Sequence, residues 1–143
     1  MKIAVACDHG GFALKEEIKK HLITEGIEVL DLGTDSEESV DYPIYGKLCG
    51  EAVMSGKAEK GIVCCGTGIG ISIAANKVKG IRCSLCTDTR MAEMTRKHND
   101  SNVLALGGRT TDVKEALEIL KTWLNTGFEG GRHKQRIDML NEM

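Results

Sequence analysis

The fold is decided by residues 61–77, which read GIVCCGTGIGISIAANK. The first five residues form an uninterrupted apolar run, which is typical of a strand buried on both faces of a sheet. Three glycines follow within residues 66–70, and residues 70–77 then have the composition of a helix. A strand, a glycine turn and a helix in this order form the building unit of a parallel sheet.

The same alternation extends in both directions along the chain. Short apolar runs predict strands at residues 3–7, 28–32, 61–65, 81–86 and 103–106. Amphipathic segments predict helices at residues 12–24, 45–54, 70–77, 89–98, 112–124 and 132–140. We therefore expect an α/β fold, a three-layer α/β/α sandwich with a Rossmann-like five-stranded parallel sheet and an extra C-terminal helix. Residues 1–143 are expected to form a single domain.

The expected last helix, at about residues 131–140, differs from the others. It follows Gly130 and Gly131, and its apolar residues are few: Ile137, Met139 and Leu140. A helix with so narrow an apolar face gains little by packing on its own core. We expect it to pack on a partner subunit.

Composition excludes several classes of function. The formal net charge is -2, whereas nucleic-acid-binding domains are usually basic, and aromatic residues make up only 3% of the chain. No apolar run approaches the length of a membrane span, and the first apolar segment is too short for a secretory signal. We expect a cytoplasmic protein that binds neither nucleic acid nor a membrane.

The six cysteines are expected to be reduced, because the cytosol keeps thiols reduced. Cys83 and Cys86 have the Cys-x-x-Cys spacing of zinc and redox sites. This pair stands alone, without a second pair or a histidine pair, and lies within the strand expected at 81–86. We interpret both thiols as small hydrophobic core residues.

Polar and glycine residues follow several of the expected strands, where open parallel sheets bind their ligands. Asp8 and His9 follow the first strand, the loop 66–70 follows the third, and Arg109 follows the fifth after two glycines. His98 and Asn99 follow the fourth helix. We expect all of these segments to converge on one site at the carboxyl edge of the sheet.

The loop 66–70 lacks the signatures of the common nucleotide-binding loops. The third glycine of a dinucleotide fingerprint falls on Ile71, and the Gly-Lys-Ser/Thr of a Walker loop is absent. An anion or oxyanion cradle at a helix N-terminus is favoured, and a tight turn that needs glycine only for packing is the alternative. Cys65 directly precedes the loop, where a helix N-terminus favours a thiolate able to take a proton from carbon. Its alternative role is structural.

Histidine and arginine residues add candidates of lower specificity. Imidazole can donate or accept a proton near neutral pH, so His98 and His9 are either acid–base groups or ordinary helix-end residues. Arg132 and Arg136 are four residues apart and share a helix face, which suits a phosphate. A solvated basic face is the alternative for these two arginines.

The motifs taken together resemble a known family, the ribose-5-phosphate isomerase B family with its allose-6-phosphate and galactose-6-phosphate isomerase relatives. The resemblance spans essentially the whole chain. It rests on the segments 6–12, 41–43, 65–70, 96–100 and 106–109 and on Arg132 and Arg136, in the order of the family. Some relatives use a glutamate shortly after the glycine loop as their base. Ile71 stands at that position, so the chain is similar to the cysteine type.

The resemblance implies an aldose–ketose isomerase that converts ribose 5-phosphate and ribulose 5-phosphate through an enediolate. Cys65 is implied as the base that moves a proton between C1 and C2, with Thr67 positioning it and His98 assisting ring opening. The loop amides are implied to stabilise the enediolate. The remaining implied substrate contacts are Asp8, His9, Tyr42, Gly66, Gly68, Ile69, Gly70, Asn99, Arg109, Arg132 and Arg136.

The family resemblance also implies a homodimer whose sites are built from both subunits, with a dimer of dimers left open, and it implies no metal and no cofactor. Three alternatives remain. The first is isomerisation of a six-carbon sugar phosphate, such as allose 6-phosphate or galactose 6-phosphate. The second is a non-catalytic sugar-phosphate sensor. The third is a flavodoxin-like electron carrier, which the scarcity of aromatic residues disfavours.

Overall fold

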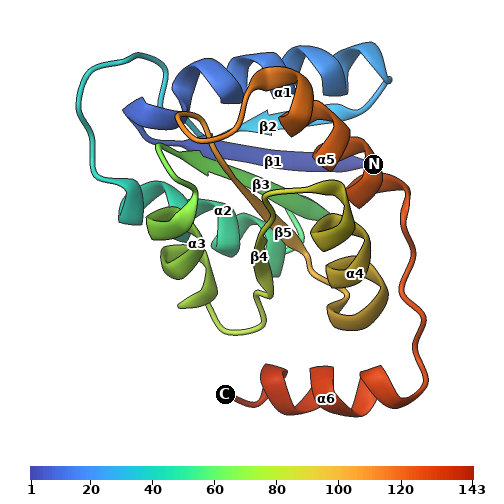
Figure 1. Cartoon of the computed structure of the whole chain (residues 1–143). Coiled ribbons are helices and arrows are strands. Elements are labelled where there is room, and N and C mark those ends of the chain that lie inside the picture. Colours follow the sequence, from blue (N-terminus) through green and yellow to red (C-terminus); the bar gives the residue numbers. More distant parts are fainter.

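Five parallel strands form one sheet in the computed structural model, which describes residues 1–143 (Figure 1). The strand order is β2-β1-β3-β5-β4. The strands are β1 (Lys2–Cys7), β2 (Glu28–Asp31), β3 (Lys60–Cys65), β4 (Cys83–Leu85) and β5 (Val103–Gly107). The helices are the short 3-10 turn η1 (His9–Gly11), α1 (Phe12–Thr24), α2 (Tyr42–Met54), α3 (Ile69–Asn76), α4 (Thr89–Asn99), α5 (Val113–Asn125) and α6 (Arg132–Asn141).

Two hydrophobic cores, one on each face of the sheet, make the predicted three-layer sandwich. Ile3, Val5 and Cys7 of β1 pack with residues of α1, α4 and α5. Ala4 and Ala6 of the same strand face the opposite core, formed with α2 and α3. Since alternate residues of a strand point to opposite faces, a strand covered by helices on both sides is apolar throughout. The predicted fold class is therefore confirmed.

Two predicted boundaries were wrong for local reasons. Helix α2 begins at Tyr42 and not at 45, because Pro43 occupies its first turn, where a missing N–H costs nothing. Strand β4 covers only Cys83–Leu85 of the predicted 81–86. On its outer side the side-chain amide of Asn76 donates to the Cys83 carbonyl (3.0 Å) and accepts from the Cys83 N–H (2.8 Å). The Asn76 amide thus pairs the backbone N–H and carbonyl of Cys83, which an exposed edge strand would otherwise leave without partners.

The Cys-x-x-Cys pair has no common site. Cys86 belongs to the core that packs against α1 and α5, whereas Cys83 packs against the opposite core. All six cysteines are free thiols. Burial raises the pKa of the Cys86 thiol to about 12, with a smaller contribution from Asp88. These thiols are core residues, as the sequence indicates.

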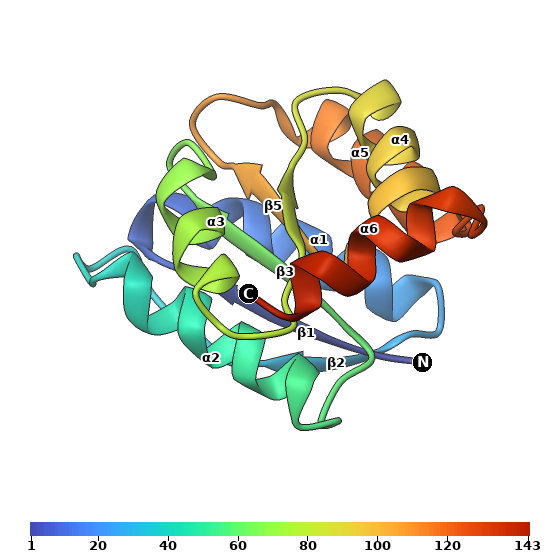
Figure 2. The same cartoon turned by 90° about the horizontal axis from the view of Figure 1, so that it is seen from below.

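The C-terminal helix α6 stands apart from the sandwich. It lies beneath α4 and β4 in Figure 1 and crosses them in Figure 2. Ile137 is its only buried residue, while Met139 and Leu140 are 60% and 46% exposed. Arg82 Nη1 donates to Asn141 Oδ1 (2.7 Å), which ties the end of α6 to the start of β4. No helix in the structure has both the length and the apolar character needed to span a bilayer.

A buried lysine joins α1 to the carboxyl end of β2. Lys15 is 1% exposed, and its Nζ donates to Asp31 Oδ1 (2.7 Å) and to the Thr34 carbonyl (2.7 Å). Lys19 Nζ donates to the other oxygen of Asp31 at 3.0 Å. Partial burial disfavours the charge of Asp31, but hydrogen bonds from Lys15, the Gly33 N–H and Lys19 lower its pKa below the usual value of 3.8.

We predict that Lys15→Met is much more destabilising than Lys19→Met, its matched control on the same carboxylate. The first variant removes the buried partner of Asp31 and should cost about 2–4 kcal/mol, whereas the exposed Lys19 should cost less than about 1 kcal/mol. Urea unfolding at neutral pH measures both. Equal costs would contradict the role of Lys15.

The cost of Lys15→Met should also depend on pH. A carboxyl whose folded pKa is depressed stabilises the fold fully above its unfolded pKa and loses this contribution as pH falls through the folded value. Because the pKa of Asp31 lies below 3.8, the difference between wild type and Lys15→Met should shrink as the unfolding pH is lowered from 7 toward 3.

Candidate active site

The carboxyl ends of β1, β3 and β5 bring three loops into contact. The Gly108 N–H donates to the Cys65 carbonyl (2.8 Å), and the Arg109 N–H donates to the Gly66 carbonyl (2.8 Å). A Cβ on Gly10 would lie 3.0 Å from the Gly66 nitrogen, so the first and third loops touch through their backbones. The predicted convergence of these three segments is confirmed.

Cys65 lies at the centre of this edge, at the N-terminus of α3. Its Sγ accepts a hydrogen bond from the Gly68 N–H (3.1 Å), and its side chain is 5% exposed. Thr67 Oγ1 accepts in turn from the Ile69 N–H (3.2 Å). The Gly68 N–H thus fixes the position of the sulfur beside the first turn of α3. Cys64, by contrast, points into the opposite core, as the strand alternation predicts.

Asp8 and His9 are fixed by the turn that follows β1. Asp8 Oδ1 accepts from the N–H groups of Gly10 (2.9 Å) and Gly11 (3.1 Å). His9 Nδ1 accepts from the Val40 N–H (3.2 Å), at the end of the acidic loop before α2. An imidazole that accepts at Nδ1 carries its N–H at Nε2. His9 therefore presents a donor on its other side.

Tyr42 and Arg109 lie against the same glycines. A Cβ on Gly70 would lie 2.7 Å from two atoms of the Tyr42 ring, so the ring packs directly on the glycine loop. The Arg109 side chain passes over Gly66 and Gly10, with its guanidinium carbon 3.4 Å from a Cβ built on Gly10. Both side chains are exposed and border the Cys65 loop.

His98 and Asn99 do not join this cluster, contrary to the prediction. They end α4, and the chain then leads through Asn102 into the start of β5, at the amino edge of the sheet. The Asn99 carbonyl accepts from Arg82 Nε (3.0 Å) just before β4. A five-residue strand separates the two edges by about 15 Å. The prediction failed because a helix that follows a strand returns the chain to the opposite edge.

Arg132 and Arg136 also lie away from Cys65, on the exposed helix α6 beside the end of α4. The chain therefore carries two groups of candidate residues at opposite edges. The carboxyl-edge group is Asp8, His9, Tyr42, Cys65, Gly66, Thr67, Gly68, Ile69, Gly70 and Arg109. The amino-edge group is His98, Asn99, Arg132 and Arg136.

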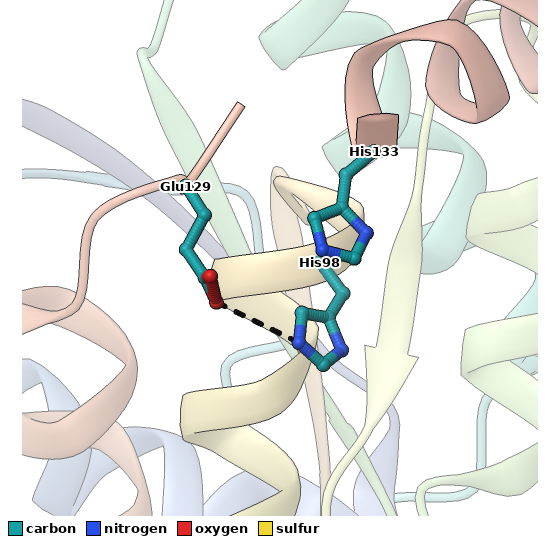
Figure 3. A group of neighbouring side chains, drawn as sticks. All are labelled: His98, Glu129 and His133. Carbon is teal, nitrogen blue, oxygen red and sulfur yellow. Dashed lines mark ion pairs between the residues drawn. The ribbon is translucent and has the colours of Figure 1, made fainter. Parts of the chain in front are cut away.

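The amino edge also holds His133 and Glu129, which the sequence analysis does not place among the predicted site residues. The rings of His98 and His133 stack with centroids 4.4 Å apart and planes inclined by 17°. Glu129 Oε1 lies 3.7 Å from His98 Nε2 (Figure 3). Partial desolvation, with the neighbouring charges of His98 and Arg132, lowers the pKa of His133. Only the proximity of His133 to Arg132 in sequence hinted at this cluster.

We predict that Gly68→Ala disturbs the candidate site more than Gly56→Ala, although both glycines have positive φ (79° and 81°). A Cβ on Gly68 would lie 2.7 Å from Leu85 Cδ1 and 2.8 Å from the Leu106 backbone, whereas a Cβ on Gly56 would contact nothing within 4 Å. Gly56→Ala should cost about 1 kcal/mol for the backbone alone. Gly68→Ala should cost at least about 2 kcal/mol more in urea unfolding, and similar costs would contradict the close packing.

Comparison with known proteins gives one consistent result. The family model described as Ribose/Galactose Isomerase matches residues 3–140. The chain is 50% identical over 139 residues to ribose-5-phosphate isomerase B of Escherichia coli. The aligned region covers 97% of this chain and 93% of the relative. It is 51% identical over 143 residues to a putative sugar phosphate isomerase of Bacillus subtilis, at 99% and 96% coverage.

Solved structures agree with the sequence relatives. Ribose-5-phosphate isomerase B of Clostridium thermocellum superposes with a TM-score of 0.98 at 54% identity, covering 99% of this chain and 96% of that one. The enzyme of Mycoplasma genitalium, solved with bound ribulose-5-phosphate, superposes with a TM-score of 0.93 at 38% identity, covering 99% and 94%. With a family match over nearly its full length, the chain belongs to the ribose/galactose isomerase family.

Proposed function

We propose that this chain is an aldose–ketose isomerase that interconverts ribose 5-phosphate and ribulose 5-phosphate. The observation that carries the proposal is the hydrogen bond from the Gly68 N–H to Cys65 Sγ, at a helix N-terminus, in a chain similar to ribose-5-phosphate isomerases B. A phosphorylated sugar substrate is also consistent with a cytoplasmic location.

Cys65 acts as the base in the proposed reaction. Its thiolate removes the proton from C2 of the opened aldose, and the negative charge of the enediolate develops on O1. The thiol then returns the proton to C1 while the hydroxyl proton of O2 passes to O1, which leaves the ketone at C2. The first N–H groups of α3, including that of Gly70, lack intrahelical partners and can donate to the charged O1 of the enediolate. Thr67 holds the first turn of the helix through Ile69. A positioned base and an oxyanion cradle are what proton abstraction next to a carbonyl requires.

The remaining carboxyl-edge residues bind the sugar in this proposal. Asp8 uses Oδ1 to bind its own turn, which leaves Oδ2 to accept from a sugar hydroxyl. His9 offers Nε2–H and Arg109 its guanidinium to the phosphate, and Tyr42 borders the sugar ring. Remote binding of the phosphate positions the reacting carbons.

The amino-edge residues act, we propose, in the site of a partner subunit. His98 assists ring opening there, Asn99 holds a reacting oxygen, and Arg132 and Arg136 complete the phosphate site. Within one chain these residues lie across the sheet from Cys65. The chain also exposes apolar side chains beside both groups, Ile69 and Ile73 of α3 (52% and 56%) and Met139 and Leu140 of α6 (60% and 46%). A homodimer buries these surfaces and completes two sites, and further assembly of dimers stays open.

Turnover of purified protein without added metal, on ribose 5-phosphate and allose 6-phosphate in parallel, tests the function. Efficient use of the five-carbon sugar supports the proposal. A preference for the six-carbon sugar keeps the mechanism and changes the substrate. Inactivity on both would favour a different sugar phosphate or a non-catalytic sensor.

We predict that Cys65→Ala abolishes turnover but still folds and binds sugar phosphate. Loss of a catalytic base should lower kcat by at least about 100-fold. Cys64→Ala is the matched control, because Cys64 is adjacent in sequence but faces the other core. It should lose stability and keep most of its activity. Near-normal turnover by Cys65→Ala would remove Cys65 from its role.

Mixing two inactive variants tests whether the sites are shared. Cys65→Ala and His98→Gln should each be nearly inactive as homodimers. If each site takes Cys65 from one subunit and His98 from the other, half of the randomly mixed dimers carry one intact site of two. Activity should then recover to about one quarter of wild type after unfolding and refolding together. Sites complete within one chain would give no recovery, because every site would carry one lesion.

A further inference from the structure

Two histidines and a glutamate from three separate segments meet at the amino edge of the sheet. His98 ends α4, Glu129 lies in the segment that precedes α6, and His133 lies in the first turn of α6 (Figure 3). One ligand atom of each residue lies within 4.8 Å of the other two. We propose that these residues bind a divalent metal ion, with Zn²⁺ the best match, and that occupation of this site inhibits the enzyme.

The donor set suits zinc. Two imidazoles and one carboxylate form a known type of three-ligand zinc site, in which a water molecule or another ligand takes the fourth position. Bonds of about 2.1 Å place tetrahedral ligand atoms about 3.4 Å apart. The Glu129–His98 pair, at 3.7 Å, is already close to this spacing. The other ligand atoms lie within 4.8 Å of one another, and the two stacked imidazoles must turn so that their nitrogen lone pairs point at the same ion.

Backbone contacts hold the three residues together without a metal. The Glu129 N–H donates to the Lys97 carbonyl (3.1 Å), directly beside His98. Arg96 Nε donates to the Thr126 carbonyl (3.1 Å), which fixes the start of the same segment to α4. Lys97 Nζ pairs with Glu93 (2.8 Å), which leaves the carboxylate of Glu129 to His98. The segment before α6 is therefore anchored where it supplies the carboxylate.

Charge acts in both directions at this cluster. Metal binding requires that both imidazoles be neutral. The charge of Glu129 attracts a cation, whereas Arg132 and Arg136 repel it. The site should consequently bind zinc more weakly than a structural zinc site with the same number of ligands.

Inhibition follows from the identity of one ligand, and this part rests on the proposed function. His98 coordinated to a metal cannot transfer a proton to the ring oxygen of the sugar. The ion would also lie beside the two arginines that are proposed to hold the phosphate. Zinc should therefore oppose both ring opening and substrate binding, while metal-free protein remains the active form.

The experiment measures binding and activity separately. Metal-free wild type, Glu129→Gln and His133→Gln are titrated with Co²⁺, which reports tetrahedral coordination by its visible absorption, and with Zn²⁺ by calorimetry. His21→Gln, a histidine change on α1, is the matched control. The turnover of each variant with zinc is then divided by its own turnover with EDTA. At a free zinc concentration ten times the measured Kd, wild-type activity should fall about tenfold.

The expected result is a tetrahedral cobalt spectrum in wild type and His21→Gln that is lost in both site variants, together with loss of zinc inhibition. The metal site would be overturned if wild type bound no metal, or if both site variants bound it as tightly as wild type. A thiolate-to-cobalt absorption band would also overturn it, because the metal would then be bound by cysteine. Binding without inhibition would overturn the regulatory part. A metal-free wild type that is inactive on sugar phosphates but binds zinc through these residues would refute the proposed function and its inhibition, and leave the metal site standing.

Discussion

Close contact between backbone segments at one edge of the sheet is the constraint on which the candidate active site depends. The turn after β1 lies against the glycine loop after β3, and the turn after β5 lies against both, with Gly108 so near the Gly10 carbonyl that a Cβ would lie 2.6 Å from its oxygen. Side chains larger than hydrogen would separate these loops. Once the loops touch, Asp8 and Cys65 come to one edge, the Gly68 N–H points at sulfur, and the Arg109 side chain passes over both glycine segments.

Much of this arrangement could be predicted from the sequence, because strands buried on both faces are apolar throughout and their carboxyl ends share an edge. The exceptions have local causes. The limits of β4 depend on the Asn76 amide, which binds the Cys83 backbone from outside the sheet, and no pattern of residue types announces such a contact. The buried polar groups were equally invisible. Lysine is usually a surface residue, so the burial of Lys15 could not be predicted from its type. Ser101 is also fully buried, and it accepts a hydrogen bond from the indole N–H of Trp123 (2.8 Å) that no sequence pattern indicates.

The wrong prediction for His98 and Asn99 has a different origin, since the order of the predicted strands and helices was enough to place both residues at the amino edge. In a parallel sheet each helix carries the chain from the carboxyl edge back to the amino edge, so residues at the end of a helix lie opposite those at the end of a strand. The motif at 96–100 ends a predicted helix and precedes a predicted strand. Its distance from Cys65 therefore follows from the sequence pattern alone, and with it the difficulty of building the whole site within one chain.

That separation determines what kind of assembly can complete the site. If the amino-edge group of one subunit meets the carboxyl-edge group of another, a two-fold axis repeats the contact in reverse and produces two identical sites in a closed dimer. Such an axis must pass between the two groups. Helix α3 begins at the Cys65 loop, runs toward the amino edge and exposes Ile69 and Ile73 along its length. A two-fold axis near α3 would bury this apolar surface twice, so the proposed pairing of half-sites and the hydrophobic gain from association favour the same dimer.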